Sequence, residues 1–133
     1  MKRRLGGVVV IDATDHEFLL PNEHGHQESA VDQPLETGQG PIALRVPHLK
    51  FGGEVRIEVP LTAEALADGS VQVSGAAKLY EGTSERTSDL DDEKRVAFTV
   101  PRGGAPALQR VQLGKRKGDH AEILICLTNA LFE

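Results

Sequence analysis

The stretch EVRIEVPL, residues 54–61, alternates polar and apolar side chains, and its apolar members include Val55, Ile57 and Val59. Residues two apart point to the same face of an extended chain. This period of two therefore predicts a β-strand with one face in a core and the other in water. Pro60 has no N–H to donate to a neighbouring strand, so it indicates a sheet edge or a bulge at that point.

The same kind of pattern recurs along the 133 residues, between segments rich in glycine, proline and charged residues. The predicted strands cover residues 8–11, 42–46, 54–61, 71–80, 95–100, 109–113 and 121–127. The segment 61–67 is the least clear, because its Ala-Glu-Ala-Leu-Ala run favours a helix but is short. The pattern predicts an all-β protein, an antiparallel two-sheet β-sandwich of about seven strands. We expect a single domain over residues 1–133, immunoglobulin-like or C2-like in general architecture.

The turn before the strand at 71–80 is predicted by parity. A three-residue loop over residues 67–69 pairs Leu61 with Gly75, so that each inward residue faces another inward residue. A two-residue turn would instead set inward residues beside outward ones. Gly69 would then take the left-handed position of a type I turn followed by a bulge.

The last predicted strand differs from the others because its outer face is not polar. Ile123 and Ile125 lie on its inner face, while Leu124 and Cys126 lie on the other. A strand that is apolar on both faces is typical of a central strand or of a contact surface.

Composition argues against several classes of partner. The net charge is −5, and basic residues cluster only at 2–4 and 115–117. With no tryptophan, one tyrosine and four phenylalanines, a nucleic-acid interface is not expected. The single cysteine cannot form an internal disulfide. The apolar run that ends at Asp12 is too short for a signal peptide or a membrane span, so we expect a cytoplasmic protein without a membrane partner.

Successive short connections in an antiparallel sandwich fall at alternate ends of the molecule. The segments 47–53, 82–93 and 114–119 are therefore expected to meet at one end. By the same rule, the long segment 15–40 should lie at the other end, with the turns at 67–69 and 101–106.

The first candidate site is acidic. Its possible ligands for calcium are Asp89, Asp91, Asp92 and Glu93. Calcium requires six to eight oxygen ligands. The EF-hand pattern fails, because Lys94 and Val100 stand where glycine and glutamate belong. The basic segment 115–117 should lie nearby and disfavours a cation, so a solvated, charge-matched loop is the favoured interpretation.

The second candidate site contains His16, His24 and His26, which could hold zinc or iron. The cupin pattern fails, because Ala30 and Val31 occupy the positions of its glutamate, so a flexible polar loop with exposed histidines is the favoured interpretation. We find no catalytic motif. Asp12 and Asp15 are paired acids, but acids at strand ends are more typical of turns.

These observations favour a non-catalytic β-sandwich module that mediates protein–protein interaction or assembly, with another protein or as a homo-oligomer. The expected interaction surface includes Leu124, Cys126 and Phe132, because apolar residues on an outer face indicate a contact. The alternative is a metal-dependent binding module, with calcium at residues 89–93 or a transition metal at the three histidines. No other cofactor is expected.

Overall fold

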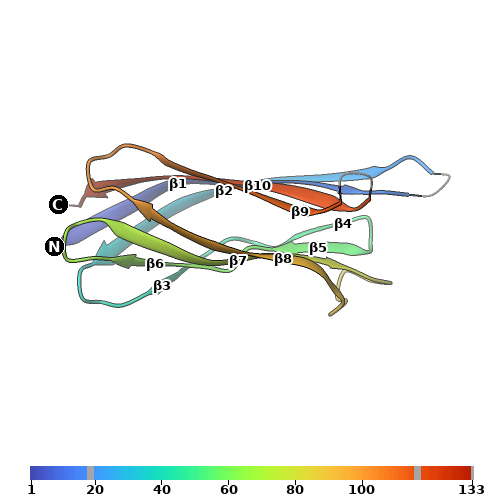
Figure 1. The fold of residues 1–133 in the computed structure, drawn as a ribbon, viewed down its shortest axis with the longest axis horizontal. Helices are drawn as coiled ribbons and strands as arrows, with labels where there is room; N and C mark the ends of the chain where they lie inside the picture. The colour runs from blue at the N-terminus through green and yellow to red at the C-terminus, as the bar shows by residue number, and fades with distance from the viewer. Residues whose placement is uncertain (18–19, 116–117, 133) are drawn as a thin grey trace.

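A computed structural model describes residues 1–17, 20–115 and 118–132, and these fold into ten strands with no helix (Figure 1). The strands are β1 (Lys2–Asp15), β2 (Glu23–Glu36), β3 (Ile42–Leu44), β4 (Leu49–Phe51), β5 (Val55–Glu58), β6 (Leu61–Ala65), β7 (Val71–Glu81), β8 (Leu90–Val100), β9 (Ala107–Gly114) and β10 (His120–Leu131). Within these ranges, no segment forms a helix long and apolar enough to cross a membrane.

The strands form two antiparallel sheets that pack face to face (Figure 1). The first sheet has the order β2-β1-β10-β9. In the second, β7 pairs with β8 on one side and with β6 and then β5 on the other, while β3 and β4 extend β6 and β5. The predicted two-sheet antiparallel sandwich is confirmed. The finer immunoglobulin-like or C2-like architecture remains a prediction.

The core lies between the sheets and is built from the inward member of each alternating pair. Val55, Ile57 and Leu79 of the second sheet are fully buried, as are Ile11 and Ile123 of the first. Burial of each such side chain stabilises the fold by roughly 1.5–3 kcal/mol. This apolar layer runs along the strands and stops where the two sheets open at the ends.

The register predicted for the hairpin around residues 67–69 is confirmed. Leu61 pairs with Gly75, the Leu66 N–H donates to the Ser70 carbonyl at 2.8 Å, and Gly69 has a φ of 87°. The proline at position 60 interrupts the strand, which resumes as β6. The segment 61–65 is therefore a strand and not a helix, because pairing on both sides of it outweighs local propensity.

The strand β2 corrects the expectation that residues 15–40 form one long connection. Its fourteen residues pair with β1 along their whole length. Its inward positions include Gln27, Ser29 and Gln33, and only Val31 and Leu35 bury apolar side chains. The alternation of apolar and polar residues is therefore too weak to reveal this edge strand.

The turn between β1 and β2 consequently lies at the end opposite to the one expected. The described parts of the connections 16–22, 52–54, 82–89 and 114–119 meet at a single end, which we call the loop end (right in Figure 1). Segments 47–53, 82–93 and 114–119 were predicted to meet, and each contributes a contact at this end, although residues 49–51 form β4 and residues 90–93 begin β8. The Gly53 N–H donates to Glu85 Oε2 at 3.1 Å, and the Gly114 N–H donates to Asp92 Oδ2 at 2.8 Å. The two chain ends lie at the opposite end.

Candidate functional site

Three carboxyl groups meet where the two sheets open at the loop end. Asp15 ends β1, Glu81 ends β7, and Asp119 precedes β10. Asp15 continues the inward series of β1 and Glu81 that of β7, so each strand carries its acid to the edge of the core. One oxygen from each of the three residues lies within 4.8 Å of the others. We call Asp15, Glu81 and Asp119 the carboxylate cluster.

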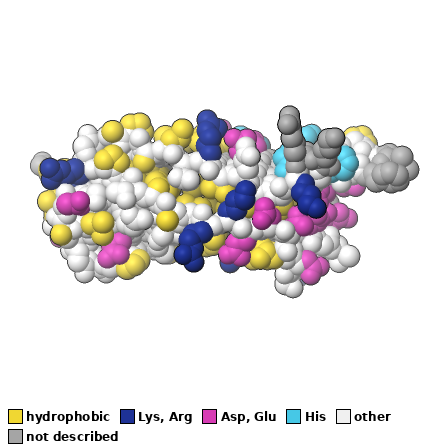
Figure 2. Space-filling view, in the orientation of Figure 1, with side chains coloured by type: hydrophobic (Ala, Val, Ile, Leu, Met, Phe, Trp, Pro, Cys, Tyr) yellow, Lys and Arg dark blue, Asp and Glu magenta, His cyan; other side chains and the backbone are white. Residues whose placement is uncertain are grey.

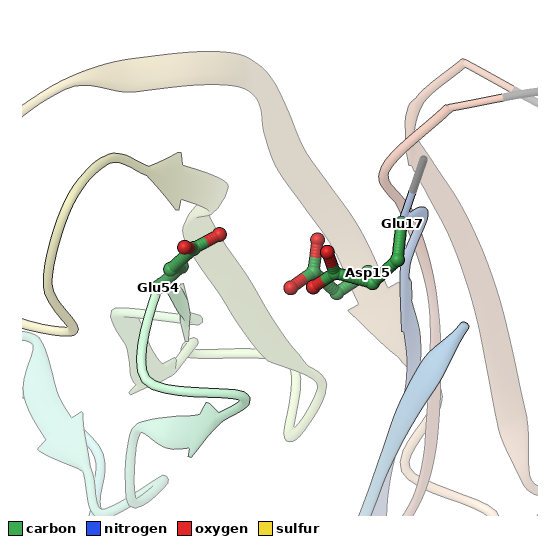
Figure 3. A group of neighbouring side chains, drawn as sticks. All are labelled: Asp15, Glu17 and Glu54. Carbon is green, nitrogen blue, oxygen red and sulfur yellow. The ribbon is translucent and has the colours of Figure 1, made fainter. Parts of the chain in front are cut away.

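A second group of acids shares Asp15 with the cluster. Oxygen atoms of Asp15, Glu17 and Glu54 also lie within 4.8 Å of one another. Figure 3 shows Asp15 and Glu17 at the end of β1, while Glu54 comes from the turn before β5 in the other sheet. The loop end therefore presents two overlapping sets of oxygen ligands, and both depend on Asp15.

Asp15 is the most constrained member of the cluster. Its side chain is only 1% exposed, and among the described residues its Oδ2 atom has no hydrogen-bond partner. Gly52, with a φ of 65°, provides the space in front of this atom. A Cβ there would lie 3.2 Å from Asp15 Oδ2 and 2.0 Å from Glu23 Oε2. The glycine therefore lets two carboxylates approach the β4–β5 turn.

The carboxylate cluster cannot carry three uncompensated charges. Two unit charges 4.8 Å apart repel by about 3.5 kcal/mol at an effective dielectric constant of about 20. Burial, together with the neighbouring Asp119, raises the pKa of Asp15 to about 7. A hydrogen bond to Asp119, together with burial, raises the pKa of Glu81 to about 8.

Asp119 therefore holds the negative charge of the cluster. Burial opposes its ionisation, but hydrogen bonds from the Glu81 carboxyl, the His16 N–H and the Asp15 carboxyl lower the pKa of Asp119. The His16 N–H donates to Asp119 Oδ1 at 2.7 Å. Near neutral pH, protons on Asp15 and Glu81 compensate the charges, unless a cation takes their place.

The cluster opens into a cleft of about 400 Å³ at the loop end. Asp91 and Asp92 line this cleft together with Glu81 and Asp119, and Lys115 contributes a positive charge. Arg116 and Lys117 lie outside the described residues. Acids and histidines also gather in the right-hand half of Figure 2. The predicted approach of the acidic segment to the turn at 114–119 is thus found at Asp92 and Gly114.

The acids predicted as calcium ligands are divided between different surroundings. Asp91 and Asp92 lie at the rim of the cleft. Asp89 is exposed and its carbonyl accepts the Glu81 N–H at 3.1 Å, while Glu93 is exposed opposite Lys78. Neither carboxylate group found among the described residues contains these four acids, so calcium binding by residues 89–93 alone stays a prediction.

The three histidines are likewise not gathered into a common site in the described chain. His24 and His26 lie on the outer face of the first sheet, where His24 Nδ1 is 3.1 Å from Thr14 Oγ1. Both ring nitrogens of His26 contact carboxylates, and the hydrogen bonds to Asp12 and Glu28 raise the pKa of His26. His16 is at the loop end. The transition-metal site stays a prediction without geometric support.

The outer face of the first sheet is apolar at its centre. Two neighbouring cross-strand rows run from β2 to β9: Ala30, Val8, Cys126 and Leu108, then Glu28, Val10, Leu124 and Arg110. We call the six apolar members of these rows the apolar face. Its central four side chains are half-buried, and Leu108 is 56% exposed. Figure 2 shows apolar side chains along the upper edge of the molecule, over this sheet.

The residues predicted as an interaction surface share this outer face. Leu124 and Cys126 are at the centre of the apolar face. Phe132 lies just beyond β10, an even number of residues after Leu124 and Cys126. Its ring centroid is 5.0 Å from the guanidinium carbon of Arg4. The half-exposed positions agree with the expectation for the last strand, which is central and still accessible from outside.

Comparison with known proteins adds no functional assignment. No protein-family model matches the chain, and neither the curated proteins nor the solved structures contain a match. Function is therefore inferred from the carboxylate cluster and the apolar face. The cluster was missed in the sequence because Asp15 resembles a turn acid. The available signal was parity, since Asp15 follows the inward residues Ile11 and Ala13.

Proposed function

We propose that this chain is a non-catalytic β-sandwich module that assembles with a second copy of itself through the apolar face. The observation that carries this proposal is the position of Val8, Val10, Leu124 and Cys126 at the centre of a sheet whose outer face no described segment covers. The outer face of an antiparallel sandwich sheet is normally polar. A contiguous apolar patch on such a face is typical of a protein contact.

A second copy is favoured because the charges around the apolar face complement themselves. Glu28 and Arg110 lie at opposite ends of one cross-strand row, on the edge strands β2 and β9. A two-fold axis parallel to the strands, between β1 and β10, reverses the strand order of the partner. Glu28 then faces Arg110 of the second copy, and Val10 faces Leu124.

The first test is the mass of the protein in solution, measured by sedimentation velocity over a range of concentrations. The wild type should form a dimer. Leu124→Ser should raise the dissociation constant at least about tenfold, since each dimer loses two buried leucines. Leu90→Ser is the matched control, because Leu90 is 47% exposed at the start of β8 in the other sheet. Phe132→Ser should weaken the dimer less.

Charge reversal tests the orientation of the two copies. Glu28→Arg alone and Arg110→Glu alone should each weaken the dimer, and the double variant should restore part of the lost affinity. The intramolecular pair of Arg110 with Glu122, at 3.1 Å and largely exposed, contributes little that would mask this effect. A wild type that is monomeric at all concentrations would contradict the proposal. Failure of the double variant to recover affinity would contradict the two-fold arrangement.

A further inference from the structure

The loop end carries a feature that self-assembly does not explain. Asp15 is 1% exposed and its Oδ2 atom has no partner in the described ranges. A buried polar atom without a partner costs free energy that a neutral side chain would avoid. Gly52 leaves open the space in front of this atom, and one oxygen of the Asp15 carboxyl lies within 4.8 Å of oxygens of Glu81 and Asp119. The arrangement therefore gathers oxygen ligands around a buried carboxyl group.

We infer that the carboxylate cluster binds a calcium ion, with Asp15, Glu81 and Asp119 as its protein ligands. The inference is independent of the proposed self-assembly, which concerns the outer face of the first sheet. All three ligands are oxygen atoms, as calcium requires, and none is a nitrogen or sulfur atom that would favour zinc. Glu17 and Glu54 form a second set of oxygen ligands with Asp15.

The oxygens are close enough together to share one calcium ion. Calcium ligands lie about 2.3–2.6 Å from the ion, so two oxygens that bind it are at most about 5.2 Å apart. Calcium also accepts several carboxylates in a flexible geometry, whereas magnesium usually keeps several of its waters. The cluster oxygens lie within 4.8 Å of one another. Three carboxylates supply three to six oxygens, and water from the adjoining cleft can complete the coordination shell.

The surrounding charges favour a cation at this position. Asp91 and Asp92 line the cleft and Glu23 approaches Asp15 across Gly52. Lys115 at the rim opposes the ion, although its side chain is exposed and screened by solvent. The cluster also joins three separate segments, which come from both sheets. Binding would therefore fix the ends of β1 and β7 relative to the turn before β10.

The direct test is titration of EDTA-treated protein with CaCl₂ at pH 8 in 150 mM salt, followed by calorimetry. We expect saturable binding of an ion at the cluster, a melting temperature that rises by several degrees, and a smaller rise with MgCl₂. Asp15→Asn and Glu81→Gln should each weaken binding at least about tenfold, because ligand charge sets calcium affinity. Circular dichroism confirms that each variant is folded.

The matched controls are Asp89→Asn and Glu93→Gln, which remove exposed acids outside the cluster. Their affinity should stay within about twofold of the wild type. The inference is overturned if 10 mM CaCl₂ produces neither heat nor a change in melting temperature. It is equally overturned if Asp15→Asn and Glu81→Gln bind as the wild type does, or if only the Asp89 and Glu93 variants lose binding.

Discussion

The replacement Asp15→Asn in metal-free buffer should change how stability depends on pH. The pKa of Asp15 is raised from 3.8 to about 7 in the folded protein, so the folded state holds a proton that the unfolded state has released. The free energy of unfolding of the wild type therefore falls as the pH rises from about 4 through 7. Asparagine resembles the protonated acid and cannot ionise, so the variant should lack this contribution.

The size of the effect follows from the number of protons involved. Where the folded state binds one proton more than the unfolded state, the free energy of unfolding falls by about 1.4 kcal/mol for each unit that the pH rises. Asp15 is half-titrated near pH 7, so between pH 5 and pH 7 its share is about 2 kcal/mol. As the pH rises from 5 to 7, the free energy of unfolding of Asp15→Asn should therefore increase by about 2 kcal/mol relative to that of the wild type.

Urea denaturation in EDTA, followed by circular dichroism at pH 5, 6 and 7, measures this difference. Circular dichroism is suitable because the chain has no tryptophan. Asp32→Asn is the control, since its carboxylate is 65% exposed in a surface pair with Arg4, and its stability should run parallel to that of the wild type. If Asp15→Asn also runs parallel, Asp15 ionises as an ordinary surface acid and the description of the cluster is wrong.

Two further substitutions test the packing of the first sheet, one beneath the apolar face and one near the end opposite the loop end. Gly7→Ala should lower the free energy of unfolding by at least about 3 kcal/mol, because the new Cβ would lie 2.0 Å from the Cys126 carbonyl oxygen and the backbone has a φ of 146°. Gly6→Ala is the control and should lower it by under about 1 kcal/mol, since the atom nearest to its Cβ is 3.8 Å away. Equal urea midpoints for the two would contradict this. Asn129→Ala should cost about 2–4 kcal/mol, because fully buried Asn129 accepts from Arg3 Nε at 2.8 Å and donates to two backbone carbonyls. A loss below about 1 kcal/mol, as expected for exposed Thr128→Ala, would contradict it.

The parts of the fold that alternate strongly were predictable from the sequence, and the weakly alternating parts were not. Residues 54–61 and 71–80 place an apolar side chain at almost every inward position, so their register followed from parity alone. The edge strand β2 was missed because glutamine and serine occupy half of its inward positions. Missing β2 also placed the turn at 16–22 at the wrong end, which separated Asp15 from the acids it contacts.

The carboxylate cluster was not predictable for a different reason. Asp15 and Glu81 belong to different sheets, and parity along one strand shows only that each points inward. Their approach depends on how the sheets stack, which no local pattern specifies. Asp119, in turn, lies two residues after the basic segment 115–117, which argued against a cation nearby. In the structure the Asp119 carboxyl turns inward, where it accepts the His16 N–H.

The position of Asp15 is informative because a neutral residue would serve the fold better. The inward series of β1 passes through Ile11 and Ala13 and then ends on a buried acid whose Oδ2 atom has no partner in the described chain. Conflicts between local chemistry and the demands of folding concentrate at functional sites. The two experiments on Asp15 test this conflict, one without a cation and one with calcium. The pH series gives the cost of ionising the cluster without a cation, and the calcium titration tests whether a cation removes that cost. If the stability of the wild type falls with rising pH and calcium does not restore it, the three carboxyl groups share protons and do not bind calcium, and the metal site is ruled out.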